Sequence, residues 1–332
     1  MRIVFVIDRI SSVGGFERIL TDKMNYLTEY TSAEVILVTV WKDRGHSAYS
    51  ISDKVRCVDL SVPLSYIGFP IAMPWALHRF NKEMKRLNPD VIVLSRALGA
   101  FFVAFSSWRG KMVYESHVPL KYLNHKWVYP LMLKRIHSVV CLTSGDAEDV
   151  MQMCSRLRCN PYIKVIPNFS CIGSNQLPDY NSPVIVAAGR RCPEKNFERL
   201  EKLWCGVKKN NTSWQLKIHH DTKDMISAYL EGSIFVMTSR FEGFGLVLIE
   251  AMSCGLPCIA FDCPYGPRDI IEDGKTGYLI PYDNDDIFIE KLTCLMEHPE
   301  ERERMGKAAK EAVKRFSRDR IMNEWEKFYF QL

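Results

Sequence analysis

The stretch SRFEGFGLVLIEAMSC, Ser239–Cys254, decides the fold. The apolar run Ile234–Thr238 before it predicts a buried strand, and the residues after its two glycines predict a helix that begins at Leu246. Glycines allow a tight turn, so the amides of Phe244, Gly245 and Leu246 would face outward at a helix N-terminus, where anions bind. The stretch therefore predicts one strand–turn–helix step of an α/β sheet, with an anion site at the turn.

Two carboxylates flank this turn. Glu242 precedes the helix, and Glu250 lies one turn inside it. A carboxylate repels a phosphate, but it accepts hydrogen bonds from sugar hydroxyls. The arrangement suits a sugar phosphate, and the alternative is a capped structural helix with incidental acids.

Short β-branched runs alternate with helix-period segments along the chain. This alternation predicts βαβ units and parallel sheets that are covered on both faces. Strands are predicted at Ile3–Ile7, Val35–Val40, Val55–Leu60, Val91–Leu94, Met112–Tyr114, Val139–Leu142, Ile163–Ile166, Val184–Ala188, Trp214–Ile218, Ile234–Thr238, Pro257–Phe261 and Gly277–Ile280. Helices are predicted at Phe16–Tyr30, Ala76–Leu87, Glu194–Asn210, Lys223–Glu231, Leu246–Ser253 and Arg268–Glu272, and in the tail at Pro299–Phe316 and Ser317–Phe330.

A segment rich in Pro, Ser, Asn and Gly, Pro167–Pro183, separates two such patterns and predicts a linker. We expect residues 1–166 and 167–316 to form two doubly wound, Rossmann-like domains, with the helix 317–332 packing back on the first. Open sheets of this class bind ligands at the carboxyl ends of their strands. Two facing sheets would therefore make a ligand cleft.

Composition and charge limit the classes of protein. The 332 residues, 47% hydrophobic and 25% charged, suffice for two globular domains. We expect a soluble, cytoplasmic protein, because no apolar run reaches the roughly 18 residues of a spanning helix. The nearest, Val62–Leu77, is interrupted by prolines and predicts a loop. Residues 1–165 carry a net charge of +8 and residues 166–332 one of −3, which indicates peripheral contact of the first domain with an anionic membrane or simply solvated helix faces.

Three more motifs follow predicted strands. GRRCPEK offers Arg190 and Lys195 to phosphate oxygens, and otherwise it is a solvated basic loop. SSVGGFER places Gly14 and Gly15 where the backbone could approach a phosphate, but it lacks the GxGxxG of a dinucleotide site and is equally well a plain turn. VYESHVP places His117 where it could donate to a sugar hydroxyl, or where it is only structural.

Together these motifs resemble those of the retaining GT-B glycosyltransferases, specifically glycosyltransferase family 4. The matching segments are GGFER (14–18), the histidine of YESHVP, VIPN (165–168), GRRCPEKN (189–196), SRFEGFGLVLIEAMSCGLPCIAFD (239–262) and GPRDIIEDGKTGYLI (266–280). Glu242 and Glu250 form the family's E-x7-E pair. The resemblance covers almost the whole chain. It implies transfer of a hexosyl or N-acetylhexosaminyl group from a nucleotide-sugar, with UDP as the expected nucleotide, to a glycan or lipid-linked acceptor in surface polysaccharide biosynthesis.

The resemblance also implies roles for the donor-side residues. Arg190 and Lys195 would neutralise the departing diphosphate together with the amides of Phe244–Leu246, which is electrostatic stabilisation of a leaving group. Glu250 would hold the ribose hydroxyls, and Glu242 would face the donor sugar. The anomeric configuration would be retained, and neither a metal ion nor a cofactor is expected.

On the first domain, the resemblance implies that Gly15 lets the backbone close over the diphosphate and that His117 contacts the donor sugar near the reacting carbon. No nucleic acid partner is expected. The triplet Asp283-Asn284-Asp285 imitates a metal-binding DxD, but it predicts a turn and a helix N-cap.

The chain departs from the family after Ile218. A loop, a helix and a strand normally follow, whereas here the predicted helix Lys223–Glu231 comes at once. About one αβ step, on the order of 30 residues, is absent. The missing strand would lie at the sheet edge, yet it would contribute to the wall around the nucleotide base. The alternative function is therefore a catalytically weakened or non-catalytic GT-B homologue that binds a partner.

Overall fold

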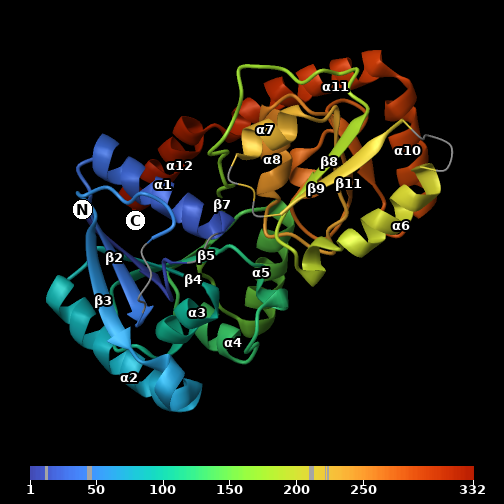
Figure 1. Cartoon of the computed structure of the whole chain (residues 1–332). Helices are drawn as coiled ribbons and strands as arrows, with labels where there is room; N and C mark the ends of the chain where they lie inside the picture. Colours follow the sequence, from blue (N-terminus) through green and yellow to red (C-terminus); the bar gives the residue numbers. More distant parts are fainter. Residues whose placement is uncertain (12–13, 43–46, 209–212, 221, 223) are drawn as a thin grey trace. The chain divides into compact units, whose positions relative to one another are not determined.

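The computed structural model describes residues 1–11, 14–42, 47–208, 213–220, 222 and 224–332. The chain divides into two compact units, unit 1 with residues 1–166 and 322–332, and unit 2 with residues 167–321 (Figure 1). Each unit is a parallel sheet with helices on both faces. The α/β class predicted from the sequence is confirmed.

Unit 1 holds a seven-stranded sheet in the order β3-β2-β1-β4-β5-β6-β7. Its strands are β1 (Arg2–Ile7), β2 (Glu34–Trp41), β3 (Arg56–Val62), β4 (Val91–Ser95), β5 (Lys111–Ser116), β6 (Ser138–Cys141) and β7 (Tyr162–Val165). Its helices are α1 (Gly15–Tyr30), α2 (Leu64–Leu87), α3 (Arg96–Phe105), α4 (Val128–Leu133), α5 (Ser144–Leu157) and most of α12 (Arg318–Gln331), with a 3-10 turn at Leu120–Tyr122. The strand order reverses between β1 and β4, which is where such sheets bind ligands.

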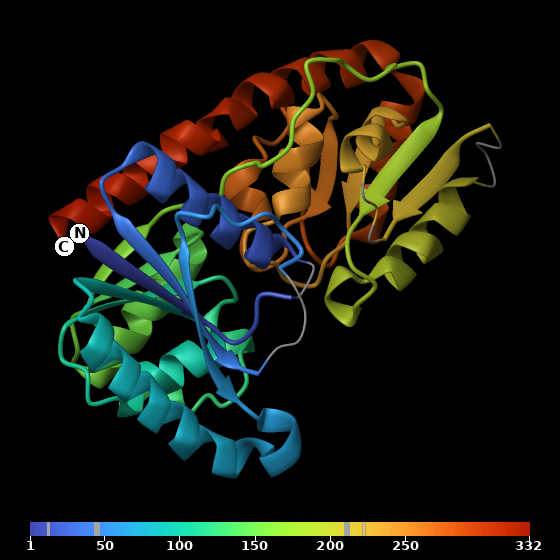
Figure 2. The same ribbon diagram turned by 60° about the vertical axis from the view of Figure 1, so that its left-hand side comes forward.

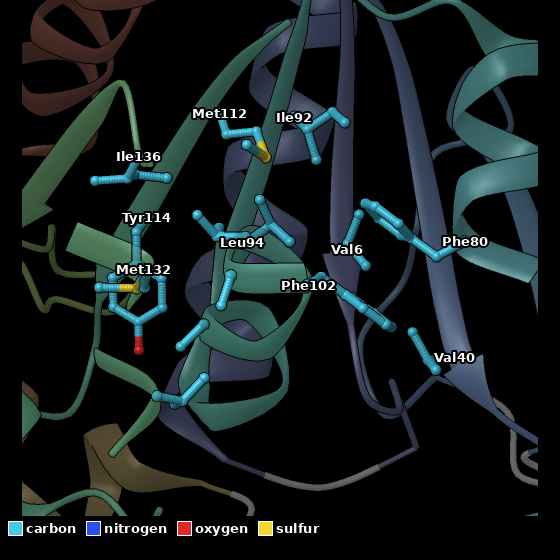
Figure 3. Close-up of a cluster of buried hydrophobic side chains, with 14 of the residues drawn as sticks. Val6, Val40, Phe80, Ile92, Leu94, Phe102, Met112, Tyr114, Met132 and Ile136 are labelled. Atoms are coloured by element: carbon cyan, nitrogen blue, oxygen red, sulfur yellow. The ribbon is translucent and has the colours of Figure 1, made fainter. Parts of the chain in front are cut away.

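Different helices pack against the two faces of this sheet (Figure 2). Alternate strand residues point to opposite faces. Val6, Leu94 and Tyr114 lie in the core beneath α2, α3, α4 and α5 (Figure 3). On the opposite face, α1 and the end of α12 lie against the sheet, and the Phe5 and Tyr329 rings meet edge to face at 6.3 Å. This second face carries the charged cluster described below.

Helix α2 shows that the loop predicted for Val62–Leu77 is wrong, because Leu64–Leu87 forms one helix. Each of its internal prolines removes a backbone hydrogen bond and disfavours a helix. From the middle of α2 onward, however, Ala76, Phe80 and Met84 form a stripe at four-residue spacing that is fully buried in the core. Tertiary burial of a stripe outweighs local helix propensity.

Unit 2 holds a five-stranded sheet in the order β12-β11-β10-β8-β9. Its strands are β8 (Val184–Ala188), β9 (Gln215–His219), β10 (Ile234–Met237), β11 (Cys258–Phe261) and β12 (Gly277–Ile280). Its helices are α6 (Phe197–Lys208), α7 (Met225–Leu230), α8 (Leu246–Ser253), α9 (Pro267–Ile270), α10 (Asp285–Glu297) and α11 (Pro299–Ala312), with 3-10 turns at Pro193–Lys195 and Val313–Phe316. The Asn284 side chain accepts from the amide of Ile287 at 3.0 Å, which confirms the predicted N-cap.

The edge strand β9 lies where the shortened sequence predicts an edge. From β9 the described chain leads through α7 directly to β10, and β9 pairs with β8. Lys217 of β9 forms an ion pair with Glu231, whose other oxygen contacts His219 Nε2. Charged side chains on an edge strand oppose pairing with another chain. Residue 223, where the sequence predicts the start of α7, lies outside the described residues.

Candidate active site

Loops that follow β8, β10 and β11 meet at the carboxyl end of the unit 2 sheet. The amide of Arg240 donates to the carbonyl of Glu194 at 2.7 Å, which ties the β10 loop to the β8 loop. The amide of Glu242 donates to the carbonyl of Pro264 at 3.2 Å, which ties it to the β11 loop. Neighbouring parallel strands bring these loops together, although they are distant in sequence.

Helix α8 begins at the residue that the sequence predicts. Gly245 caps the helix with φ +102°, a left-handed conformation that favours glycine, and Leu246 is the first helical residue. Phe244 is buried, and its ring contacts that of Phe316 edge to face at 5.5 Å. A Cβ at Gly266 would lie only 2.0 Å from the carbonyl oxygen of Phe244, so this glycine lets the β11 loop pack against the turn.

Lys195 and Glu242 form the ion pair at the centre of this loop cluster. Lys195 Nζ lies 2.6 Å from Glu242 Oε1, which also accepts from the Ser239 hydroxyl at 2.6 Å. The two charged side chains are 17% and 9% exposed. The stem of Lys195 lies over Gly189, where a Cβ would be 3.3 Å from Cε. The pair is thus largely shielded from water, which strengthens its attraction.

Arg190 and Glu250 lie at the edges of this arrangement. The Arg190 side chain is exposed, so it is accessible to a dissolved anion. Glu250 Oε2 accepts from the hydroxyl of Tyr229 of α7 at 2.9 Å. Burial, and then the charge of Glu250, raise the pKa of Tyr229 well above its usual value, which keeps it protonated as a donor. Tyr229 therefore fixes one oxygen of the carboxylate.

The candidate residues of unit 1 lie around the start of α1. Gly14 caps α1 with an extended backbone and accepts from the amide of Arg18 at 3.1 Å, and Gly15 is exposed. The next residue, Phe16, contacts the His117 imidazole edge to face with 4.6 Å between ring centroids. The structure therefore brings the glycine pair and His117 together within this unit.

His117 is held by a carboxylate two residues before it. His117 Nε2 lies 2.8 Å from Glu115 Oε2, and the His117 side chain is only 5% exposed. Burial lowers the pKa of His117, although Glu115 opposes this shift. The imidazole is therefore neutral at physiological pH.

A pocket of about 230 Å³ opens at the carboxyl end of the unit 1 sheet. Its lining includes the aromatic rings of Trp41, Phe101 and Trp127 and the charged side chains of Asp8 and Arg96. Arg96 Nη1 lies 3.0 Å from Asp8 Oδ1. Arg96 also has φ +57°, a strained conformation for a residue with a Cβ, and such strain clusters at functional sites.

Asp146 at the start of α5 is a second perturbed acid of unit 1. It is 1% exposed, and its hydrogen-bonding neighbours are the neutral hydroxyl of Ser116 and the neutral thiol of Cys141. Burial raises its pKa to about 6. A buried carboxylate that no cation faces costs stability when it is charged.

We expect Asp146→Asn to stabilise unit 1 above pH 6 and to leave it unchanged near pH 4. Because the pKa is raised, ionisation of Asp146 destabilises the folded protein. This destabilisation is absent below the pKa of the unfolded chain, near 4, grows between pH 4 and pH 6 and is complete above pH 6. About 1–3 kcal/mol should be gained at pH 8. Melting curves at pH 4 and pH 8 measure this, and equal shifts at both values would contradict it.

Sequence reasoning missed four of these residues: Glu115, Tyr229, Arg96 and Asp146. Only Glu115 could have been found from the sequence, since it is a charged residue directly after the apolar run Met112–Tyr114 that predicts a buried strand. Tyr229 and Arg96 lie next to ordinary strands, and their partners come from other elements.

Among the described residues, no group of three or more His, Cys, Asp or Glu is placed to hold a metal ion. No described helix is long and apolar enough to cross a membrane.

Comparisons with known proteins show which proteins the chain is similar to. The family model of the group 1 glycosyl transferases matches residues 208–312. The chain is 25% identical over 363 residues to the amylovoran biosynthesis glycosyltransferase AmsD of Erwinia amylovora, covering 98% of each chain. It is 23% identical over 320 residues to a lipopolysaccharide 1,6-galactosyltransferase of Escherichia coli, covering 84% of each. The crystal structure of Anabaena HepE with UDP-glucose superposes with a TM-score of 0.76 at 16% identity, covering both chains fully.

These similarities support a group 1 glycosyltransferase with two parallel-sheet α/β domains. Relatives from polysaccharide and lipopolysaccharide biosynthesis support glycosyl transfer as the activity, and they do not favour the non-catalytic alternative.

Proposed function

We propose that the protein is a retaining glycosyltransferase of family 4 that moves a sugar from a UDP-sugar to a glycan or lipid-linked acceptor in surface polysaccharide biosynthesis. The observation that carries this proposal is the shielded Lys195–Glu242 pair beside the N-terminus of α8. A cation and outward-facing amides bind a diphosphate, and a carboxylate next to them binds sugar hydroxyls.

In this proposal, Lys195, Arg190 and the amides at Phe244–Leu246 stabilise the negative charge that develops on the departing diphosphate. They take the place of a metal ion, so transfer needs none. Fixed cations and dipoles in a site that excludes water stabilise such charge strongly. Glu242 accepts from hydroxyls of the donor sugar, and Glu250, held by Tyr229, accepts from the ribose hydroxyls.

The unit 1 pocket is proposed to hold the acceptor sugar. Aromatic rings such as Trp127 pack against the apolar face of a sugar ring, while Asp8 and Arg96 offer an acceptor and donors to its hydroxyls. Gly14, Gly15 and His117 are proposed to contact the donor. Contact of unit 1 with an anionic membrane stays a prediction. Trp127, 59% exposed, and the neighbouring Lys126 are the side chains suited to it.

Calorimetric titration with UDP and GDP, without added metal, tests the donor site. We expect UDP to bind, and Arg190→Ala to weaken it by about 10- to 100-fold because one charge-assisted hydrogen bond is lost. Arg320→Ala, which removes another exposed arginine of unit 2, serves as the control. If neither nucleotide binds to folded protein, the shortened sheet lacks a donor site, and the non-catalytic alternative replaces this proposal.

A further inference from the structure

One buried carboxylate on the α1/α12 face of the unit 1 sheet has donors on three sides. Both oxygens of Glu115 lie 2.8 Å from Lys23 Nζ of α1, and Oε1 accepts from the Tyr329 hydroxyl of α12 at 3.0 Å. The Lys23 and Glu115 side chains are 1% and 2% exposed. Lys23 Nζ also lies 3.5 Å from the centre of the Trp325 ring. The carboxylate is therefore fixed in position.

The remaining contact of this carboxylate is with His117. Glu115 Oε2 lies 2.8 Å from His117 Nε2, and among the described residues no hydrogen bond to Nδ1 of His117 is found. The pKa of Glu115 is lowered to about 2: burial opposes this, and Lys23 and His117 together outweigh it. An ionised carboxylate can only accept hydrogen bonds.

This chemistry decides which ring nitrogen carries the hydrogen. His117 is neutral, because burial disfavours its cation and lowers its pKa. The positive charges of Lys23 and Arg96 lower the pKa further, and only the charge of Glu115 opposes them. A neutral imidazole carries one N–H hydrogen. Because Nε2 faces a carboxylate, which can only accept, this hydrogen must be on Nε2. Nδ1 then has a free lone pair.

We propose that Glu115 and Tyr329 are positioning residues that hold His117 as the Nε2–H tautomer, so that Nδ1 accepts a hydrogen bond from a substrate hydroxyl. This reverses the donor role expected for His117 from the sequence. The identity of that substrate rests on the proposed function, whereas the tautomer does not.

Tyr329 acts through Glu115 rather than on substrate. Removing its hydroxyl takes one hydrogen bond from the carboxylate, which leaves more negative charge to face the imidazole. The imidazolium form then becomes more favourable, so the pKa of His117 rises and Nδ1 is protonated over more of the pH range. Tyr329→Phe should thus shift the acidic limb of the kcat/KM profile to higher pH.

The experiment is ¹⁵N NMR of histidine-labelled, unliganded full-length protein, with the His117 signal assigned by its loss in His117→Gln. We expect the Nε2–H tautomer in the wild type and a raised His117 pKa in Tyr329→Phe. Tyr129→Phe is the matched control, since Tyr129 is equally buried in unit 1 but donates to the carbonyl of Asn124. In that control, neither the tautomer nor the pKa should change.

Kinetics supply the second readout. With a transferred sugar identified, Tyr329→Phe should shift the acidic limb of the kcat/KM profile to higher pH by roughly one unit, and above that limb kcat should stay within about twofold of the wild type. An Nδ1–H tautomer in the wild type would overturn the proposal. So would a Tyr329→Phe protein that matches Tyr129→Phe in both His117 pKa and pH profile. The NMR measurement needs no enzymatic activity. It therefore still tests the tautomer of His117 if the protein proves not to transfer sugar.

Discussion

Lys195→Ala should lower the rate of sugar transfer by at least about 100-fold. Lys195 lies in the loop cluster at the carboxyl end of the unit 2 sheet, and its Nζ lies 2.6 Å from Glu242 Oε1. Removing one preorganised donor to a developing charge costs about 10²–10³ in kcat in well-studied sites. The measurement is the initial rate with saturating UDP-sugar, compared with the wild type.

Two further variants make this test specific. Lys202→Ala removes an exposed lysine of α6, and we expect it to keep wild-type activity. Glu242→Gln removes the carboxylate and frees Lys195, so it should bind UDP at least as tightly as the wild type while transferring sugar more slowly. A Lys195→Ala protein within about threefold of the wild type would remove Lys195 from the mechanism.

Glu115→Gln should cost unit 1 about 3–5 kcal/mol of stability. The substitution keeps the size of the side chain, but it turns one acceptor oxygen into an NH2 donor. It also leaves the ammonium of Lys23 buried without an opposite charge. Breaking a buried pair from one side has this cost, whereas replacing both partners by apolar groups is often nearly neutral. Urea unfolding, with hydrogen exchange of the β5 amides as the local probe for unit 1, measures the loss.

The double variant Lys23→Met/Glu115→Gln is the control, and it should recover most of that loss. The pH dependence gives an independent check. The pKa of Glu115 is lowered from 4.5 to about 2, so its stabilising contribution is complete above pH 4.5 and is lost as the pH falls to 2. Glu115→Gln should lack this part of the acid transition. An unchanged acid transition in Glu115→Gln would show that the pair adds nothing to stability.

Much of the fold followed from local patterns. Each predicted strand is present within a few residues, because a β-branched apolar run between turns has few alternatives inside an α/β chain. Only the first half of α2 was missed, because its prolines argue locally for a loop. The helix predicted at Ala76–Leu87 is present as the second half, where Phe80 and Met84 are buried in the core.

The candidate site divides in the same way. The sequence was enough to place the loops with Arg190, Lys195, Glu242 and Gly245 at the same end of the sheet, since the carboxyl ends of parallel strands lie together there. That Lys195 pairs with Glu242, or that Tyr229 holds Glu250, could not be predicted, because side-chain partners depend on how neighbouring loops and helices pack.

The sequence by itself determined the order of the strands along the chain, several of the helices between them and which motifs stand at strand ends, because these depend on residue periodicity and glycine turns within a few residues. The tertiary structure decided the charge and hydrogen-bond partners. Glu115 is 92 residues from Lys23 and 214 from Tyr329. Only the packing of α1 and α12 on one face of the sheet brings these groups around a single carboxylate, and burial there fixes the state of His117.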